Sequence, residues 1–370
     1  MAPVTITVWD FNTNTFLTHL PYADAQYAVR LNDAGECTIT IDLADTATHG
    51  PVTVIQSLNG APFKVLFSQG PIILHAAFIY RVEMSSDTFA VKLTGAALTS
   101  ALTLVTNEVA GIGVGAPLVT DPVTVIEKIL DGAQTTLPLY ITHRRQVQGL
   151  PAAATWTYSK DATAGQILAD ATAAVTPGTG GVDWTIENSL VGDRPSHTMV
   201  IWTPRAGTDY HTSGWSVDLT RAAAWQWNTD AQRMTTKVVA VGSGAGSNAA
   251  IRSVAATTKA TGGLGQLPVF TGVYQFSQVN DQGRLDAISH GLISLFGGPV
   301  AAPTITLPID YPTLPLGAAA IGDDVRLTAP VCPWFPLGLN QWWRAVAYSV
   351  NIPAQGVATV QWTFNTPPAY

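Results

Sequence analysis

The chain has 370 residues and a formal net charge of −7, with only 18 Lys and Arg residues. Sequence-independent binding to nucleic acid needs a dense field of positive charge, so this composition argues against DNA or RNA binding as the main function. The length predicts two to four domains, each large enough to bury its own core. Cys37 and Cys332 are too few for a disulfide framework or a structural zinc site, and we expect two buried free thiols.

Charged residues are scarce, at 12% of the chain, while hydrophobic residues reach 47%. The longest uncharged stretches, 65–80 and 345–370, are interrupted by Gly-Pro or alternate with polar residues. A transmembrane helix needs a continuous apolar run of about twenty residues, and residues 1–8 do not follow the pattern of a signal peptide. The sequence therefore predicts no membrane span. Because obligate interfaces are depleted in charge, it predicts a surface covered by neighbouring chains.

Residues 1–105 are predicted to form an antiparallel, barrel-like β-domain. Polar and apolar residues alternate in the segments expected to be strands, which are 4–9, 27–31, 37–43, 63–67, 78–84 and 89–94. The turn at 32–36 contains Asp and Gly, which supply the positive φ that a hairpin requires. A small barrel or sandwich accommodates this number of strands. The run at 95–104 is compatible with a helix.

Residues 106–220 are predicted to form a mixed α/β domain. Asp121 and Pro122 have the residue types of an N-cap and a first helical position, and an apolar stripe follows them. Asp161 is expected to cap a second helix over 161–175. Strands are expected at 139–142, 184–187 and 199–202. The alternation of helices and strands indicates an α/β insertion in a mainly β protein.

The last part of the chain returns to a β pattern. Residues 221–255 and 302–370 are predicted to form a second barrel-like domain, and 256–301 a small helix-containing insertion. The expected helix, 280–296, ends at Gly297-Gly298-Pro299, a strong C-terminal signal. The fold class is therefore mainly β with α/β insertions: two antiparallel barrel-like domains, a mixed α/β domain and a helical insertion.

Two segments share one pattern, 63–94 and 324–364. Each contains a short strand, a variable excursion, and two long alternating strands joined by a tight polar turn. This order is typical of an antiparallel meander. Either an internal duplication or two ordinary meanders would produce the similarity. A duplication would give the chain pseudo-symmetry and would favour a ring-like assembly.

No catalytic, cofactor-binding or metal-binding residue emerges, and we predict that the protein is not an enzyme. The histidines contain no pair spaced for a shared metal ion, no serine lies in a nucleophile elbow, and the glycines at 242–246 lack the spacing of a phosphate loop. Adjacent strand residues point to opposite faces, so Asp323 and Asp324 are not placed to act together on a glycosidic bond. A further polar group, close in sequence but more typical of a surface loop, comprises His197, Asp209, Tyr210 and His211.

Tryptophan is abundant, with 11 residues. Aromatic side chains in loops stack on sugar rings, so a carbohydrate-binding or glycan-degrading module is an alternative function. Trp342 and Trp343 point to opposite sides of their predicted strand, so one of them needs cover from elsewhere. Since tryptophan is enriched in protein interfaces, the candidate interface residues are Trp225, Trp227, Trp334, Trp342 and Trp343.

Several segments in this order resemble the minor tail proteins of long-tailed phages of actinobacteria. They are RLNDAGECTITIDLAD, VKLTGAALTSAL, LTRAAAWQWNTDAQRMTTKVVAVGSGAG and IGDDVRL before the final meander. The resemblance spans essentially the whole chain through loose patterns. It is to the hub proteins of the tail tip, which are similar in fold to the baseplate hub of contractile-tailed phages.

The resemblance implies a structural virion component at the tail tip, assembled in the host cytoplasm and without a cofactor. Such hubs form homotrimers in which two barrel-like domains per subunit make a pseudo-six-fold ring. The ring adapts the six-fold tail tube to the three-fold tip. The implied partners are further copies of the chain, a distal tail or tail tube protein, the tape measure protein and other minor tail proteins. DNA would pass through the lumen without specific binding, and any lysin or adhesin would be a separate polypeptide.

Overall fold

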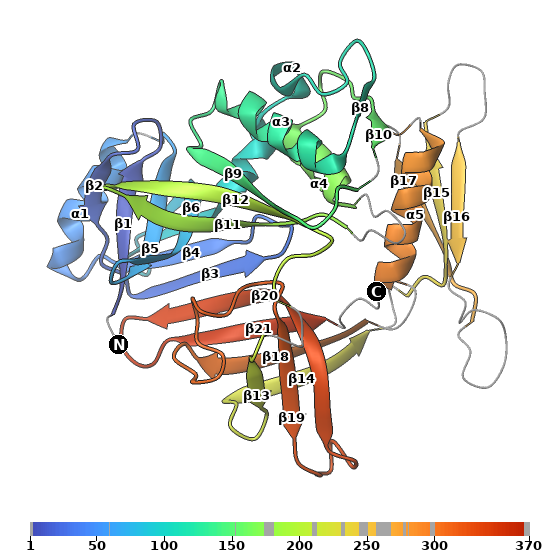
Figure 1. The fold of residues 1–370 in the computed structure, drawn as a ribbon. Helices are drawn as coiled ribbons and strands as arrows, with labels where there is room; N and C mark the ends of the chain where they lie inside the picture. Colours follow the sequence, from blue (N-terminus) through green and yellow to red (C-terminus); the bar gives the residue numbers. More distant parts are fainter. Residues whose placement is uncertain are drawn as a thin grey trace.

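The protein is represented by a computed structural model, mainly β, with 48% strand and 18% helix (Figure 1). The residues that the structure describes are 3–58, 60–151, 153–173, 181–208, 213–230, 234–243, 251–256, 268–276, 279, 281–296 and 300–365. Within these ranges, none of the helices has the length and apolar character of a membrane span.

The largest sheet contains strands from both ends of the chain. Its N-terminal strands are β1 Val4–Asp10, β2 Phe16–His19, β3 Asp24–Arg30, β4 Cys37–Asp42, β5 Phe63–Gln69, β6 Ile72–Ser85 and β7 Ala90–Ala97. Its C-terminal strands are β13 Ser216–Asp218, β14 Ala224–Asp230, β18 Val300–Pro308, β19 Asp324–Ala329, β20 Leu339–Pro353 and β21 Thr359–Asn365. The order is β14-β18-β21-β20-β3-β4-β7-β6-β5-β1-β2, with β19 pairing to β20 and β13 to β19.

The predicted barrels are not closed: within the described part of the chain the two strand sets join in one large sheet, and no sheet closes into a barrel. The junction is the antiparallel pair β20–β3, from Ala347 opposite Arg30 to Pro353 opposite Asp24. Strand β20 has 15 residues and bends, so that its first part pairs with β19 and its later part with β3 (Figure 1). One hydrophobic core contains buried residues from both strand sets.

Both predicted meanders are present, as β5-β6-β7 and β19-β20-β21. In each of them the long middle strand shifts register against the third strand by one residue, at Tyr80 in β6 and at Val346 in β20. A β-bulge at the same step of both meanders is an additional likeness that their sequences do not reveal. It supports the internal duplication, which stays a prediction.

The middle of the chain is a mixed α/β region, as predicted. It comprises a 3₁₀ helix η2 Leu98–Leu104, α2 Asn107–Ala110, β8 Leu118–Thr120, α3 Pro122–Gln134, β9 Ile141–Val147, β10 Ala154–Trp156, α4 Ala164–Ala173, β11 Asp183–Val191 and β12 Arg194–Thr203. The Asp121 side chain accepts a hydrogen bond from the Thr124 amide at 3.0 Å, which confirms its capping role. The expected cap at Asp161 is wrong: the Thr163 hydroxyl accepts from the Gln166 amide at 3.1 Å.

A third unit, which we call the α5 module, contains β15 Lys237–Gly242, β16 Arg252–Ala256, β17 Thr271–Phe276 and α5 Gln282–Phe296. The predicted helix is confirmed over its described residues. Its three strands form a sheet of their own in the order β16-β15-β17. The segment 221–255 was predicted to belong entirely to the second β-domain, but only β14 of this segment lies in the large sheet. The other domain boundaries stay predictions.

The sequence patterns missed two elements near the N-terminus, β2 and the helix α1 His49–Ser57, which follows the short 3₁₀ helix η1 Thr46–Thr48. Helix α1 places only Val52 and Ile55 in the core. Its apolar stripe is therefore narrow, and its sequence contains Gly50 and Pro51, which are poor helix signals.

Candidate functional site

Four of the five candidate tryptophans gather in one aromatic cluster around Phe335. Trp225 and Trp227 are two residues apart on β14, so their side chains share a face of the strand. Trp227 lies 5.0 Å from Trp343 and 5.4 Å from Phe335, measured between ring centroids. Trp225 lies 5.5 Å from Phe335 and 6.2 Å from Trp334. These spacings are those of favourable aromatic pairs.

The outer end of this cluster is the loop between β19 and β20. Cys332 and Phe335 exchange both backbone hydrogen bonds, at 3.0 and 3.1 Å, and so hold the loop in a tight conformation. Three large side chains on it are exposed: Val331 by 72%, Trp334 by 76% and Leu337 by 96%. We call these three residues the apolar tip. Figure 1 shows the β19–β20 hairpin projecting from the lower end of the molecule.

The five predicted interface residues do not share one environment. Trp343 is only 5% exposed and belongs to the large core. Trp342 is half-buried, consistent with the prediction that neighbouring residues on the strand face opposite sides. Trp225 and Trp227 are half-buried and pack against the core. Trp334 alone of the five is largely exposed, so the candidate interface is the apolar tip.

Cys37 and Cys332 differ from the expectation of two buried thiols. Cys37 is buried in the large core, and burial raises its pKa to about 12. Cys332 is half-buried beside the apolar tip. Both are free thiols.

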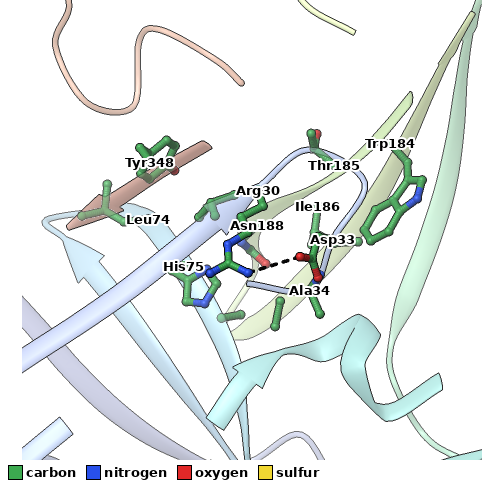
Figure 2. Close-up of a pocket in the computed structure, with 13 residues that line it drawn as sticks. Arg30, Asp33, Ala34, Leu74, His75, Trp184, Thr185, Ile186, Asn188 and Tyr348 are labelled. Carbon is green, nitrogen blue, oxygen red and sulfur yellow. Dashed lines mark hydrogen bonds and ion pairs between the residues drawn. The ribbon is translucent and has the colours of Figure 1, made fainter. Parts of the chain in front are cut away.

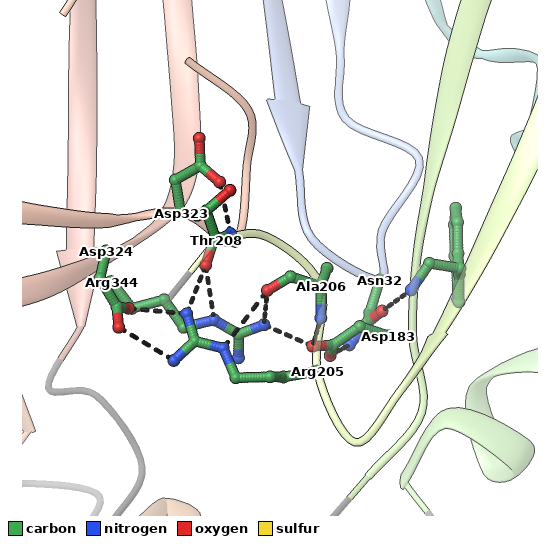
Figure 3. Close-up of polar contacts among 10 residues, drawn as sticks. Asn32, Asp183, Arg205, Ala206, Thr208, Asp323, Asp324 and Arg344 are labelled. Atoms are coloured by element: carbon green, nitrogen blue, oxygen red, sulfur yellow. Dashed lines mark hydrogen bonds and ion pairs between the residues drawn. The ribbon is translucent and has the colours of Figure 1, made fainter. Parts of the chain in front are cut away.

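A polar junction fixes the mixed α/β region against the large sheet. The Arg344 guanidinium donates to the Asp183 carboxylate, and Arg205 makes two bonds to Asp324, at 2.7 and 3.1 Å (Figure 3). All four side chains are at least mostly buried. Since a buried charge is stable only when paired and hydrogen-bonded, each pair locks two segments that are far apart in the sequence.

The same junction also contains the turn after β3. The Asn32 amide donates to Asp183 at 2.8 Å and accepts from the Trp184 backbone amide at 2.7 Å. Its φ of +61° lies in the left-handed region, which Asn tolerates better than most residues. At the other side of the junction, a Cβ on Gly207 would lie 2.0 Å from the backbone of Gly322, so the two chain segments approach too closely for a side chain.

The pair Asp323–Asp324 is structural, as the sequence indicated. Asp324 pairs with Arg205, whereas Asp323 accepts hydrogen bonds from the Thr208 amide, the Trp215 indole and the Ala320 amide at 2.6 to 2.9 Å. The two carboxylates serve different partners (Figure 3). Sequence reasoning placed this pair at a turn but missed Asp183, Arg205 and Arg344, because each finds its partner more than a hundred residues away.

A small cavity of about 40 Å³ lies where β3, β6, β11 and β20 meet (Figure 2). It shares lining residues with an open cleft of about 310 Å³, among them Leu74, Asn188 and Tyr348. Burial lowers the pKa of His75 to about 3, and in the described part of the chain its Nε2 has no hydrogen-bond partner. Arg30 and Asp33 pair with each other across 3.4 Å. The cavity therefore presents a neutral imidazole and an ion pair, with room for a water molecule.

The predicted surface role of His197 is wrong. His197 is fully buried, and its Nδ1 lies 2.8 Å from the Asn188 side chain. Its suggested neighbours Asp209, Tyr210 and His211 lie outside the described residues, as does most of the glycine run 242–246. Within the described ranges, no group of three or more His, Cys, Asp or Glu residues is arranged to hold a metal ion.

No protein-family model and no curated protein matches the sequence. Solved structures do match over almost the whole chain. A tail protein from Neisseria meningitidis MC58 has a TM-score of 0.61 at 12% identity, covering 98% of this chain and 96% of its own. The 43 kDa tail protein of prophage MuSo2 from Shewanella oneidensis has a TM-score of 0.60 at 10% identity, covering 98% of both chains.

A third match is an Escherichia coli component of the type VI secretion system, described as structurally similar to the T4 bacteriophage tail proteins gp27 and gp5. Its TM-score is 0.50 at 10% identity, covering 95% of this chain and 74% of its own. At such identities the likeness concerns the fold. The chain has the fold of phage tail proteins and of tail-hub-like proteins.

Proposed function

We propose that the protein is a structural component of a phage tail tip, a hub that forms a homotrimeric ring. The observation that carries the proposal is the whole-length likeness to phage tail proteins, with 98% of the chain covered. The two bulged meanders support the pseudo-symmetry that such a ring requires. In this arrangement each subunit presents two related β-units, so three chains offer six similar docking surfaces to a six-fold tail tube.

The remaining expectations belong to the same proposal. The ring would contact the distal tail or tail tube protein, the tape measure protein and other minor tail proteins. It would have no enzymatic role of its own and would be assembled in the cytoplasm of an actinobacterial host. Because the chain carries a net charge of −7, we expect a neutral to negative lumen along which DNA slides without binding.

The apolar tip gives the proposal a local test. The Trp334→Ser substitution is expected to leave the thermal unfolding temperature nearly unchanged, because the side chain is 76% exposed. It should weaken trimer formation or incorporation into tails at least tenfold, since exposed Trp residues are frequent binding hot spots. Trp343→Ser is the matched control: its side chain is buried, so it should lower stability by about 3–5 kcal/mol.

Mass measurement tests the assembly itself. Native mass spectrometry of the purified chain, alone and with its tail partners, should give a species of three copies. A chain that stays monomeric under all these conditions would contradict the ring. Binding on a glycan array that is lost in Trp334→Ser would instead support the carbohydrate-binding alternative.

A further inference from the structure

The α5 module packs against the mixed α/β region through a deeply buried arginine. In Figure 1, α5 lies between its own strands and the elements α4 and β10. Arg284 is on α5 and is only 2% exposed. Of the described strands of the module, none pairs with the large sheet. The module core is also small, with Ala240, Val279, Leu285 and Ile288 as its buried members.

Arg284 enters a slot built by Trp156, Tyr158 and Asp170. Its guanidinium carbon lies 4.0 Å from the Trp156 ring centroid and 5.2 Å from that of Tyr158. The guanidinium donates to the Tyr158 hydroxyl and lies 3.4 Å from the Asp170 carboxylate. Tyr158 in turn donates to Asp170 at 2.9 Å. Two aromatic rings and a carboxylate are the chemistry that recognises a planar cation.

The described residues that build and support the slot belong to the mixed α/β region. Trp156 is fixed by an indole hydrogen bond to the Thr120 carbonyl at 2.9 Å, and Asp170 lies on helix α4. The module has its own internal bonds, such as the buried contact of 2.8 Å between the hydroxyls of Ser253 and Ser289. These hydrogen bonds stabilise each of the two bodies internally, and Arg284 forms an ion pair with Asp170 across the contact between them.

We propose that Trp156, Tyr158 and Asp170 form a guanidinium-binding slot, and that Arg284 is a latch that docks the α5 module into it as a movable unit. Desolvating an arginine is costly, and the Nε of Arg284 has no hydrogen-bond partner among the described residues. Docking therefore depends on stacking and on the pairs to Tyr158 and Asp170. An arginine of a neighbouring protein has the chemistry to compete for the slot when the module withdraws.

Hydrogen exchange of the full chain tests the latch. In Arg284→Ala, amide exchange in α5 should accelerate about tenfold or more, while the large sheet stays unchanged, because the module loses its docking contact but not its fold. Arg284→Lys keeps the charge without the planar stacking and should give an intermediate rate. Arg252→Ala, which removes an exposed arginine of the same module, is the matched control and should leave exchange unaltered.

Chemical rescue tests the slot. Methylguanidinium is added at concentrations well below those that denature the protein. It should slow α5 exchange in Arg284→Ala only in part, because it fills the slot but is not covalently attached to the module. It should also protect the amides around Trp156 in that variant. The Arg284→Ala/Asp170→Asn double variant should not respond. Equal exchange in Arg284→Ala and Arg252→Ala would overturn the latch, and an absence of any saturable response to methylguanidinium would overturn the slot.

Discussion

Asp183→Ala is expected to destabilise the protein by about 3–5 kcal/mol, the usual cost of leaving one partner of a buried ion pair uncompensated. The substitution leaves the Arg344 guanidinium without its carboxylate in a mostly buried position. It also removes the acceptor for the Asn32 side chain and for the Ala206 amide. The midpoint of urea unfolding measures the change, and the loss should begin with separation of the mixed α/β region from the large sheet.

The control for Asp183→Ala lies on the same strand. Glu187 pairs with Arg144 at 2.9 and 3.0 Å, but both side chains are about half exposed. Glu187→Ala should therefore cost at most about 1 kcal/mol. The Asp183→Leu/Arg344→Met double variant removes both charges and should recover part of the stability lost in Asp183→Ala. Equal effects of Asp183→Ala and Glu187→Ala would contradict a structural role for the buried junction.

Local patterns in the sequence were enough to predict most of the longer strands and the helices α3, α4 and α5. The alternation of Val4, Ile6 and Val8 predicted β1, and Asp121-Pro122 predicted the start of α3, because these signals act within a few residues. The joining of the two β-units was not predictable in this way. It depends on the pairing of β20 with β3, and the bend of β20 follows from a bulge that no residue type announces.

The candidate site was predictable only in part, for a similar reason. The abundance of tryptophan drew attention to Trp334 and Trp343 alike. The structure distinguishes them, because Trp334 is exposed and Trp343 is buried. This difference depends on the tertiary packing of β14 against the β19–β20 hairpin, which local sequence patterns do not show. The sequence does contain a weak sign that Arg284 is buried. It is next to Leu285 and four residues before Ile288, on the apolar side of the predicted helix. A charge in that position indicates a buried partner elsewhere.

Acidification from pH 7 to pH 4.5 is expected to destabilise the protein through two buried histidines. Burial lowers the pKa of both His75 and His197 to about 3, the latter with smaller contributions from Lys64 and His75. In the unfolded chain both histidines bind protons below about pH 6.5. The unfolded state therefore takes up more protons than the folded state as the pH falls, and stability decreases from about pH 6.5 towards pH 3.

The packing explains why the folded protein keeps both rings neutral. His75 is stacked on Tyr27 with a centroid distance of 4.8 Å and an interplanar angle of 4°. The Nε2 atoms of both His75 and His197 are buried and have no hydrogen-bond partner within the described ranges, so a proton on either would be an uncompensated charge. Each histidine lowers the free energy of unfolding by about 1.4 kcal/mol per pH unit below its unfolded pKa, so the two together cost at most about 5.5 kcal/mol at pH 4.5.

Urea unfolding at pH 7 and pH 4.5 measures this dependence. The His75→Phe/His197→Gln double variant loses some stability at pH 7, because it changes packed side chains, but its stability should fall much less between the two pH values. His290→Gln, which removes an exposed histidine of α5, should keep the wild-type pH dependence. The interval from pH 7 to pH 4.5 lies mostly above the pH range in which carboxylates ordinarily titrate, so protonation of the histidines can be distinguished from protonation of Asp and Glu. A double variant with the full wild-type pH dependence would show that acid acts through other groups.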